Sequence, residues 1–222
     1  MSRFIENDKG IMGLTLSQIA LIIATSILIA AVFSLIFLND WQRNAELKNI
    51  ATSFSSIVEG MDTRFFEDTT SFRFPDRGYY YNVSLSTGYI VVSAKGNFDN
   101  DLSVKERFLV RPWPQSMASP WIGEIGLHNY LKSYLHNGDT HDWVNDSGNI
   151  SDPIAPDDID CVKDYLSASQ QIVNISLASH PQYIITNKPV YIDKAIVYYD
   201  NDGSGVWEKN EDRQEFIFIY QY

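Results

Sequence analysis

A twelve-residue segment near the C-terminus, DNDGSGVWEKNE, has the residue types and the spacing of a metal-binding loop. Calcium takes about six to eight oxygen ligands from a tightly curved chain, and such a loop supplies them at fixed positions. Counted from Asp200, Gly205 stands at the sixth position, where a glycine permits the turn. The predicted ligands are the side chains of Asp200, Asp202, Ser204, Glu208 and Glu211 and the backbone carbonyl of Val206. We therefore expect this loop to bind Ca2+.

The segment resembles the calcium loop of EF-hand proteins, complete to the glutamate at position twelve. Its flanks depart from that family, because Ala195 to Tyr199 and Phe216 to Tyr222 are rich in strand-forming residues. The resemblance therefore implies a calcium loop between two strands. The alternative is a plain acidic hairpin turn around Asp202-Gly203. A second acidic run, Asp99 to Asp101, lacks the later ligands and is interpreted as a turn.

Other reactive residues do not form a recognisable catalytic set. The chain has no G-x-S-x-G motif, no phosphate-binding loop and no Cys-His pairing, so we expect no enzyme. The single cysteine, Cys161, excludes an intrachain disulfide. Four Asn-x-Ser sequons are candidate glycosylation sites if they lie outside the cytoplasm: Asn82, Asn145, Asn149 and Asn174.

An apolar stretch from Leu14 to Leu38 contains no charged side chain in 25 residues. As a helix it would measure about 37 Å, enough to cross a hydrocarbon core of about 30 Å. A cleaved secretory signal is the alternative, but its apolar region is shorter and ends in small residues. This stretch instead precedes Trp41, a residue type that anchors helices at the membrane surface. We expect a transmembrane helix with the N-terminus in the cytoplasm and the C-terminal part outside.

The polar leader that ends in Lys9-Gly10, followed at once by an apolar helix, resembles type IV pilin-like proteins with an archaeal class III signal. That resemblance implies a prepilin peptidase as partner, cleavage after Gly10, and a helix that remains as membrane anchor and filament core. A second register places Gly13 before Leu14-Thr15-Leu16-Ser17-Gln18, similar to the bacterial start of these proteins. Gln18 stands where the family has the glutamate that pairs with a neighbouring subunit, so here only a hydrogen bond remains possible. An ordinary single-pass anchor is the alternative.

The pattern after the apolar stretch predicts that the helix continues to Asp62. Apolar residues form a single stripe with alternating spacings of three and four: Leu47, Ile50, Phe54, Ile57 and Met61. A helix from about Met12 to Asp62 would measure about 75 Å. Two heptads are too few for a stable coiled-coil stalk, so we expect the stripe to pack against the chain's own sheet.

The remaining residues predict a mainly antiparallel β-sheet head, so that the fold class is α+β with a long N-terminal helix packed on the sheet. Predicted strands are 79–85, 89–94, 107–111, 183–186, 190–192, 195–199 and 216–222, with helices at 125–135 and, shorter, from about 157. The predicted organisation is a leader (1–10), a transmembrane helix (11–38), its amphipathic continuation (39–62) and an extracytoplasmic head (63–222).

Charge narrows the possible partners. The formal net charge is -11, and residues 1–38 contribute none of it, so the head carries all the excess negative charge. Such a surface repels nucleic acid and anionic lipid. Two functions remain: a pilin-like structural subunit of a surface filament or secretion system, with copies of itself or other pilin-like subunits as partners, or a membrane-anchored binding module that does not polymerise.

Overall fold

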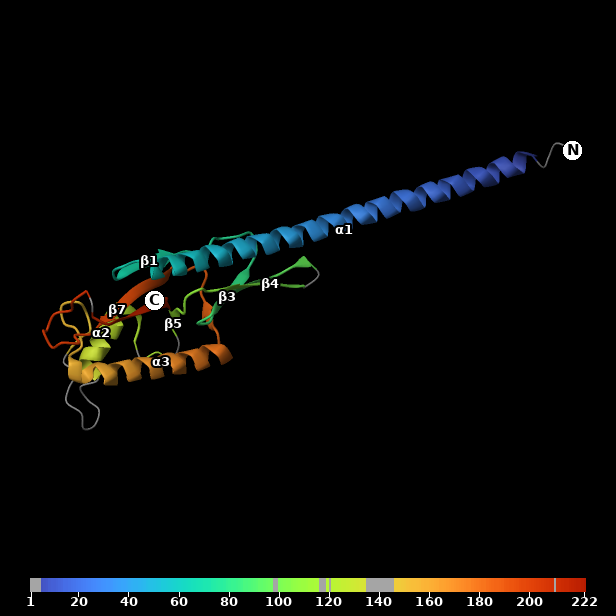
Figure 1. The fold of residues 1–222 in the computed structure, drawn as a ribbon. Helices are drawn as coiled ribbons and strands as arrows, with labels where there is room; N and C mark the ends of the chain where they lie inside the picture. Colours follow the sequence, from blue (N-terminus) through green and yellow to red (C-terminus); the bar gives the residue numbers. More distant parts are fainter. Residues whose placement is uncertain (1–4, 98–99, 116–118, 120, 135–145, 210) are drawn as a thin grey trace.

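The protein consists of one long helix that leans along a head built from two β-sheets and two further helices (Figure 1). The structure is a computed structural model, which describes residues 5–97, 100–115, 119, 121–134, 146–209 and 211–222. The fold is α+β, with the long N-terminal helix packed on mainly antiparallel sheets, as the sequence predicts.

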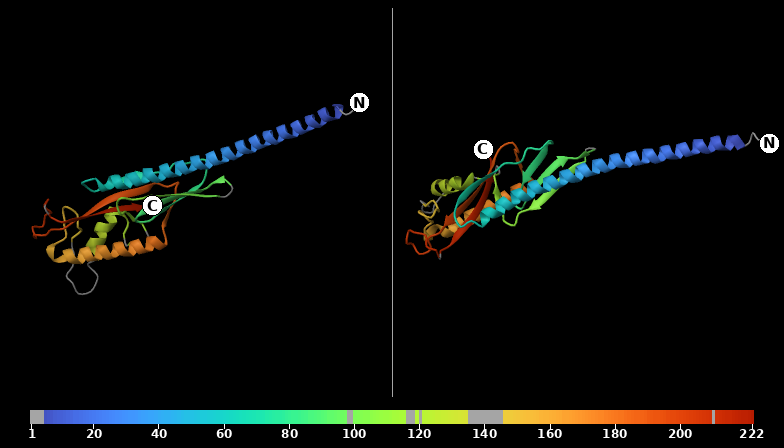
Figure 2. Two further views of the ribbon diagram at one scale, coloured as in Figure 1. Left: turned by 45° about the vertical axis from the view of Figure 1, so that its right-hand side comes forward. Right: turned by 90° about the horizontal axis from the view of Figure 1, so that it is seen from above.

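Helix α1 runs without interruption over Ile5–Asp62, about 87 Å at the usual rise. Its first half projects away from the head, and its second half lies along it in all three views (Figures 1 and 2). The apolar part is long and apolar enough to cross a membrane, and none of its most apolar window is buried within the molecule. Asn97 of the head bonds α1 at two places one turn apart. Its side-chain amide donates a hydrogen bond to the carbonyl of Ile36 at 3.2 Å, and its backbone amide donates one to the carboxylate of Asp40 at 2.9 Å.

Two four-stranded sheets form the head. Every strand pair is antiparallel except β5–β8, which is parallel. The first sheet has the order β1 (Asp68–Phe72), β7 (Val190–Tyr198), β8 (Arg213–Tyr220) and β5 (Trp113–Pro114). The second has the order β4 (Asp101–Arg107), β3 (Tyr89–Lys95), β2 (Tyr81–Leu85) and β6 (Gln182–Ile184).

The first sheet separates two apolar cores, because successive side chains of a strand point to opposite faces. On β8, Ile217 and Ile219 join α1 and the second sheet in one core, whereas Phe216 and Phe218 join the other. That second core is closed by α2 (Gly123–Tyr134) and by α3 (Ile159–Ser179), which follows the short 3-10 helix η2 (Pro156–Asp158). Figure 1 shows the resulting layers, with α1 on one side of the sheets and α3 on the other.

The predicted apolar stripe of α1 is buried as expected. Leu47, Phe54 and Met61 are fully enclosed and Ile50 almost so, while Ile57 is partly buried against the same core. The Phe54 ring lies 5.4 to 6.3 Å from three other phenylalanine rings, those of Phe72, Phe74 and Phe108. Burying this stripe is what fixes the helix to the head.

Several predicted boundaries are wrong. The strand that follows β3 in the chain is β4, Asp101–Arg107, which pairs with β3 in register from Lys95–Asp101 to Tyr89–Arg107. The predicted strand 107–111 does not form. The predicted strands 190–192 and 195–199 are one strand, β7. The helix expected to be short is the 21-residue α3, and strands β1 and β5 were not predicted at all.

Candidate functional site

The predicted calcium loop joins β7 to β8 at the end of the head that lies farthest from the projecting half of α1 (Figure 1). Its backbone bends sharply at Gly203 and Gly205, each with a φ of 77°. This left-handed conformation is readily adopted only by glycine. The ring of Trp207 packs edge-on against Tyr198 at 4.9 Å, which holds the loop to the end of β7.

Asp200 organises the first half of the loop from an almost completely buried position. Its two carboxylate oxygens accept hydrogen bonds from the amides of Gly203 at 2.8 Å, Ser204 at 3.1 Å and Gly205 at 2.6 Å. Burial raises the pKa of Asp200, but the hydrogen bonds from Gly205 and Gly203 outweigh it, so the pKa lies below its ordinary value. The carboxylate is therefore ionised at neutral pH.

Glu211 closes the loop from its other end. Its two carboxylate oxygens accept hydrogen bonds from the amides of Asn201 at 2.7 Å and Glu208 at 2.6 Å. One oxygen each of Asp200, Asp202 and Glu211 then lie within 4.8 Å of one another. The structure thus brings together three of the four predicted acidic ligands, and carboxylate oxygens are the donors that calcium prefers.

Of the remaining predicted ligands, two bond each other and one lies outside this group. The Ser204 hydroxyl donates a hydrogen bond to the Val206 carbonyl at 2.9 Å, so these two ligands satisfy each other. Glu208 is exposed, and its carboxylate is not part of the three-residue group. The donor set and the curved backbone fit a hard cation. Glu208 would join the coordination of an ion only by a change of its side chain or through a water molecule.

A second group of possible ligands was not predicted. His128 stands alone in the sequence, but the fold brings it to Glu67, which precedes β1, and to Glu124, one turn earlier on α2. The only sequence signal for it is the spacing of four between Glu124 and His128, which places both on one face of the predicted helix. Glu67 is distant in sequence, so nothing in the pattern points to it.

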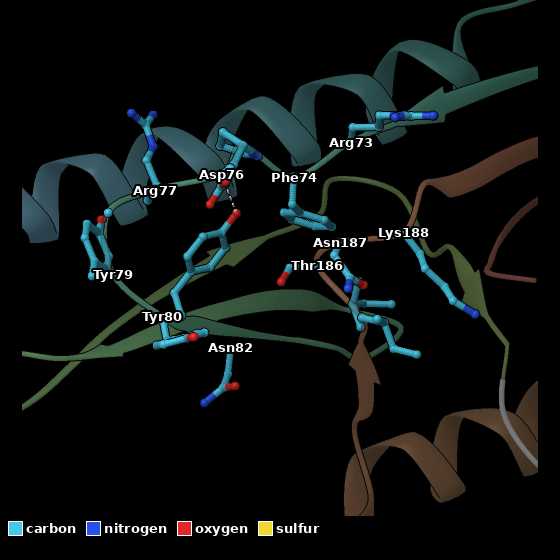
Figure 3. A pocket seen from close by; sticks show the side chains of 15 residues that line it. Arg73, Phe74, Asp76, Arg77, Tyr79, Tyr80, Asn82, Thr186, Asn187 and Lys188 are labelled. Carbon is cyan, nitrogen blue, oxygen red and sulfur yellow. Dashed lines mark hydrogen bonds between the residues drawn. The ribbon is translucent and has the colours of Figure 1, made fainter.

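A pocket of about 850 Å³ opens between the connection from β1 to β2 and the segment after β6 (Figure 3). Figure 3 shows Arg77 and Lys188 on opposite sides of it, with Arg73 near α1. Asp76 is the one acidic residue among those that line it. The side chain of Tyr80 is 99 % exposed and borders both this pocket and a second hollow beside it. The lining is therefore basic and aromatic on a strongly acidic protein.

The predicted processing residues lie on α1, and the candidate glycosylation sites lie elsewhere. Lys9 and Gly10 belong to the helical backbone of α1, and Gln18 is an exposed residue farther along it. The sequons are scattered: Asn82 is exposed on β2, Asn149 and Asn174 are partly exposed in a turn and on α3, and Asn145 lies outside the described residues.

No protein-family model, no curated protein sequence and no solved structure matches this chain. Its function is accordingly inferred from its own residues and their arrangement.

Proposed function

We propose that the protein is a pilin-like structural subunit, held in a membrane by the first half of α1 and presenting its acidic head outside the cell. The observation that carries this proposal is the division of α1 into a bare apolar half and a half fixed to the head. Leu21, Ile22 and Ile23 are each more than half exposed, although they are consecutive and so face different sides of the helix. A helix that is apolar all round requires lipid or other apolar helices as its surroundings.

Assembly would use the same surface. In a filament, the apolar half of each α1 would pack against the apolar helices of neighbouring copies or of other pilin-like subunits. The apolar side chains of these helices would take the place of lipid. Gln18 lies within this exposed half and offers an amide to a neighbouring chain. The leader that ends in Lys9-Gly10 would be removed first by a prepilin peptidase, and the head, with a net negative surface, would face outward.

Calcium would stabilise the outer end of the head. Asp200, Asp202 and Glu211 bring three carboxylates together in the connection between β7 and β8. Their mutual repulsion opposes this hairpin unless a cation is present. The bound ion would therefore strengthen the pairing of the two central strands of the first sheet, at the place most exposed to the medium.

The processing step tests the proposal directly. Mass spectrometry of the protein purified from its native membranes should find a mature chain that begins at Ile11. Replacing Gly10 by Phe should leave the leader attached, whereas Gly13→Phe should not affect cleavage if the first register is the correct one. Native protein that still begins at Met1 or Ser2 in cells with an active prepilin peptidase would refute the pilin-like function.

The pocket favours a second candidate, a membrane-anchored binding module that does not polymerise. Three cationic residues, Arg73, Arg77 and Lys188, line this pocket together with exposed Tyr80, and this combination suits an anionic ligand with a flat face. Under this function, the protein would bind a carboxylated polysaccharide such as polygalacturonate, and Arg77→Glu would abolish that binding. A protein that remains monomeric in the membrane and binds this probe would favour the binding module.

A further inference from the structure

The partly buried group around His128 has the residue types of a transition-metal site. The Nε2 atom of His128 lies 3.0 Å from an Oε1 atom of Glu67, and one carboxylate oxygen of Glu124 lies within 4.8 Å of both. Two ligands of one tetrahedral zinc ion, each bound at about 2.0 to 2.1 Å, are themselves separated by about 3.3 Å. The distance between His128 and Glu67 is therefore close to that of two ligands of one ion, and the Glu124 oxygen is near enough to be a third ligand.

His128 is oriented from its other nitrogen. The Nδ1 atom lies 2.7 Å from the backbone carbonyl oxygen of Ser147, which can only accept a hydrogen bond. Nδ1 therefore carries a proton, and Nε2 is the atom directed at the Glu67 carboxylate. Because that carboxylate also only accepts, Nε2 donates a proton to it in the metal-free protein, and a bound ion would displace this proton. Histidine ligands of metals are commonly fixed in this way, with one ring nitrogen donating to a carbonyl and the other binding the ion. His128 is also about nine-tenths buried, so the ring cannot easily turn away.

The group carries an excess of negative charge beside a further buried carboxylate. Asp193 is 4 % exposed and faces the first turn of α2, where one of its oxygens lies 3.4 Å from the amide of Glu124. That oxygen also accepts a hydrogen bond from the Tyr220 hydroxyl at 2.6 Å. Its other oxygen, Oδ1, has no hydrogen-bond partner among the residues that the structure describes. A buried carboxylate oxygen without a partner is costly, and a nearby cation would offset that cost.

Among the described residues, His128 is the ion-pair partner of Glu67, and Glu124 has none. Lys194, the residue after Asp193, points to the other face of β7, where it bonds Glu215 at 2.6 Å and the carbonyl of Asp62 at 2.7 Å. Its ammonium group is therefore not directed at these carboxylates.

We propose that Glu67, Glu124 and His128 bind a zinc ion, with a water molecule completing the tetrahedron and Asp193 close behind the site. The imidazole nitrogen makes this donor set suited to zinc, whereas the all-oxygen loop at Asp200 suits calcium. The ion ties the segment that leaves α1 to α2, and so joins the two cores on opposite sides of the first sheet. This site is independent of whether the protein forms filaments.

Metal binding by the full-length chain in detergent tests the proposal. A Cys161→Ser background removes the exposed thiol as a competing ligand. After chelator treatment and dialysis, calorimetric titration with zinc chloride should show one tight site per chain, and cobalt chloride should give the visible absorption of a tetrahedral Co2+ site. Glu124→Gln keeps the size of the side chain but removes a ligand, so it should abolish both signals. Glu211→Gln, in the calcium loop, should leave both unchanged.

Two results would overturn the zinc site. One is a folded parent protein that binds no zinc, in which case His128 and Glu67 form only an ion pair. The other is a Glu124→Gln variant that binds zinc as tightly as the parent. If Glu124→Gln does not fold by circular dichroism, Glu67→Gln provides the same comparison, because it removes a ligand from a residue outside the helix.

Discussion

The two halves of α1 belong to one continuous helix, yet they present opposite surfaces. From Thr15 to Leu38, large apolar side chains are exposed on every side, whereas from Asn39 to Asp62 all of them except the exposed Trp41 are confined to a buried stripe. The first pattern suits an apolar solvent and the second suits a protein core. The distribution of apolar residues around the helix, more than their number, therefore decides which half packs on the head.

The largest expected effect comes from emptying the buried stripe. Phe54→Ala should lower the free energy of unfolding of the head by about 3–5 kcal/mol, because the enclosed ring leaves a cavity among three other rings. Phe33→Ala, in the exposed half, should change it by less than about 0.5 kcal/mol. Urea unfolding of the full chain in detergent, followed by tryptophan fluorescence, measures both. Equal effects of the two substitutions would remove the distinction between the halves.

The next effect concerns the membrane. Leu28 is central to the apolar half, and Leu28→Lys should cost about 2.5–3.5 kcal/mol for insertion at the helix centre. Ser53→Lys, on the exposed side of the packed half, should cost nothing there. The fraction of protein that stays in carbonate-washed membranes should fall for the first variant only. If Leu28→Lys remains membrane-bound like the parent, the apolar half does not serve as the anchor.

Calcium should stabilise the packed half through the head and leave the apolar half unaffected. At a free Ca2+ concentration of 100 times its dissociation constant, the ion should add about 2.7 kcal/mol to the stability of the head. Glu211→Gln removes a predicted ligand while keeping its size, so calcium should no longer raise the melting temperature of this variant. Magnesium should act less, because it demands a tighter octahedral cage. Identical melting of parent and variant, with and without calcium, would reduce the loop to an acidic turn.

The smallest expected effect is alkaline destabilisation at the border between helix and head. The Tyr79 hydroxyl donates a hydrogen bond to Glu46 of α1 at 2.9 Å, and burial, then this bond, raises the pKa of Tyr79 to about 12 from 10.0. Between these two values the unfolded chain loses a proton that the folded protein keeps, so stability falls as the pH rises. Below pH 10 this contribution is fully present.

Tyr79→Phe should therefore make the loss of stability between pH 10 and 12 shallower, although it does not abolish it. Burial also raises the pKa of Tyr199 and Tyr220, and both remain in the variant. Thermal melting at a series of pH values measures the slope. An unchanged slope would mean that the Tyr79–Glu46 bond does not contribute to holding α1 on the head.

The sequence was sufficient where one local pattern decides the structure. The stripe of α1, the hairpin of β2 and β3 and the turn at Gly203 and Gly205 all follow from periodicity or glycine placement. Three carboxylates of the predicted calcium loop come together for the same reason, since they lie close to one another in the sequence. These features require no knowledge of what packs against them.

The sequence was insufficient where partners distant in the chain decide the structure. Asp193 and Lys194 look like a break between two strands, but Tyr220 and Glu215 supply each with a partner, so β7 continues through them. His128 likewise could not be identified as a possible ligand from the sequence, because Glu67, which lies beside it in the fold, is 61 residues away. Buried polar residues depend on such contacts, which no local pattern encodes.

Thiol labelling tests the two environments of α1 most directly. In a Cys161→Ser background, Ser26→Cys and Ser53→Cys place one thiol in each half, at positions that are both exposed in the isolated chain. In intact cells, a membrane-impermeant maleimide should modify Ser53→Cys from outside and should modify Ser26→Cys only after denaturation. Labelling of Ser26→Cys as fast as Ser53→Cys in untreated cells would contradict the assignment of this half to lipid or to a filament core.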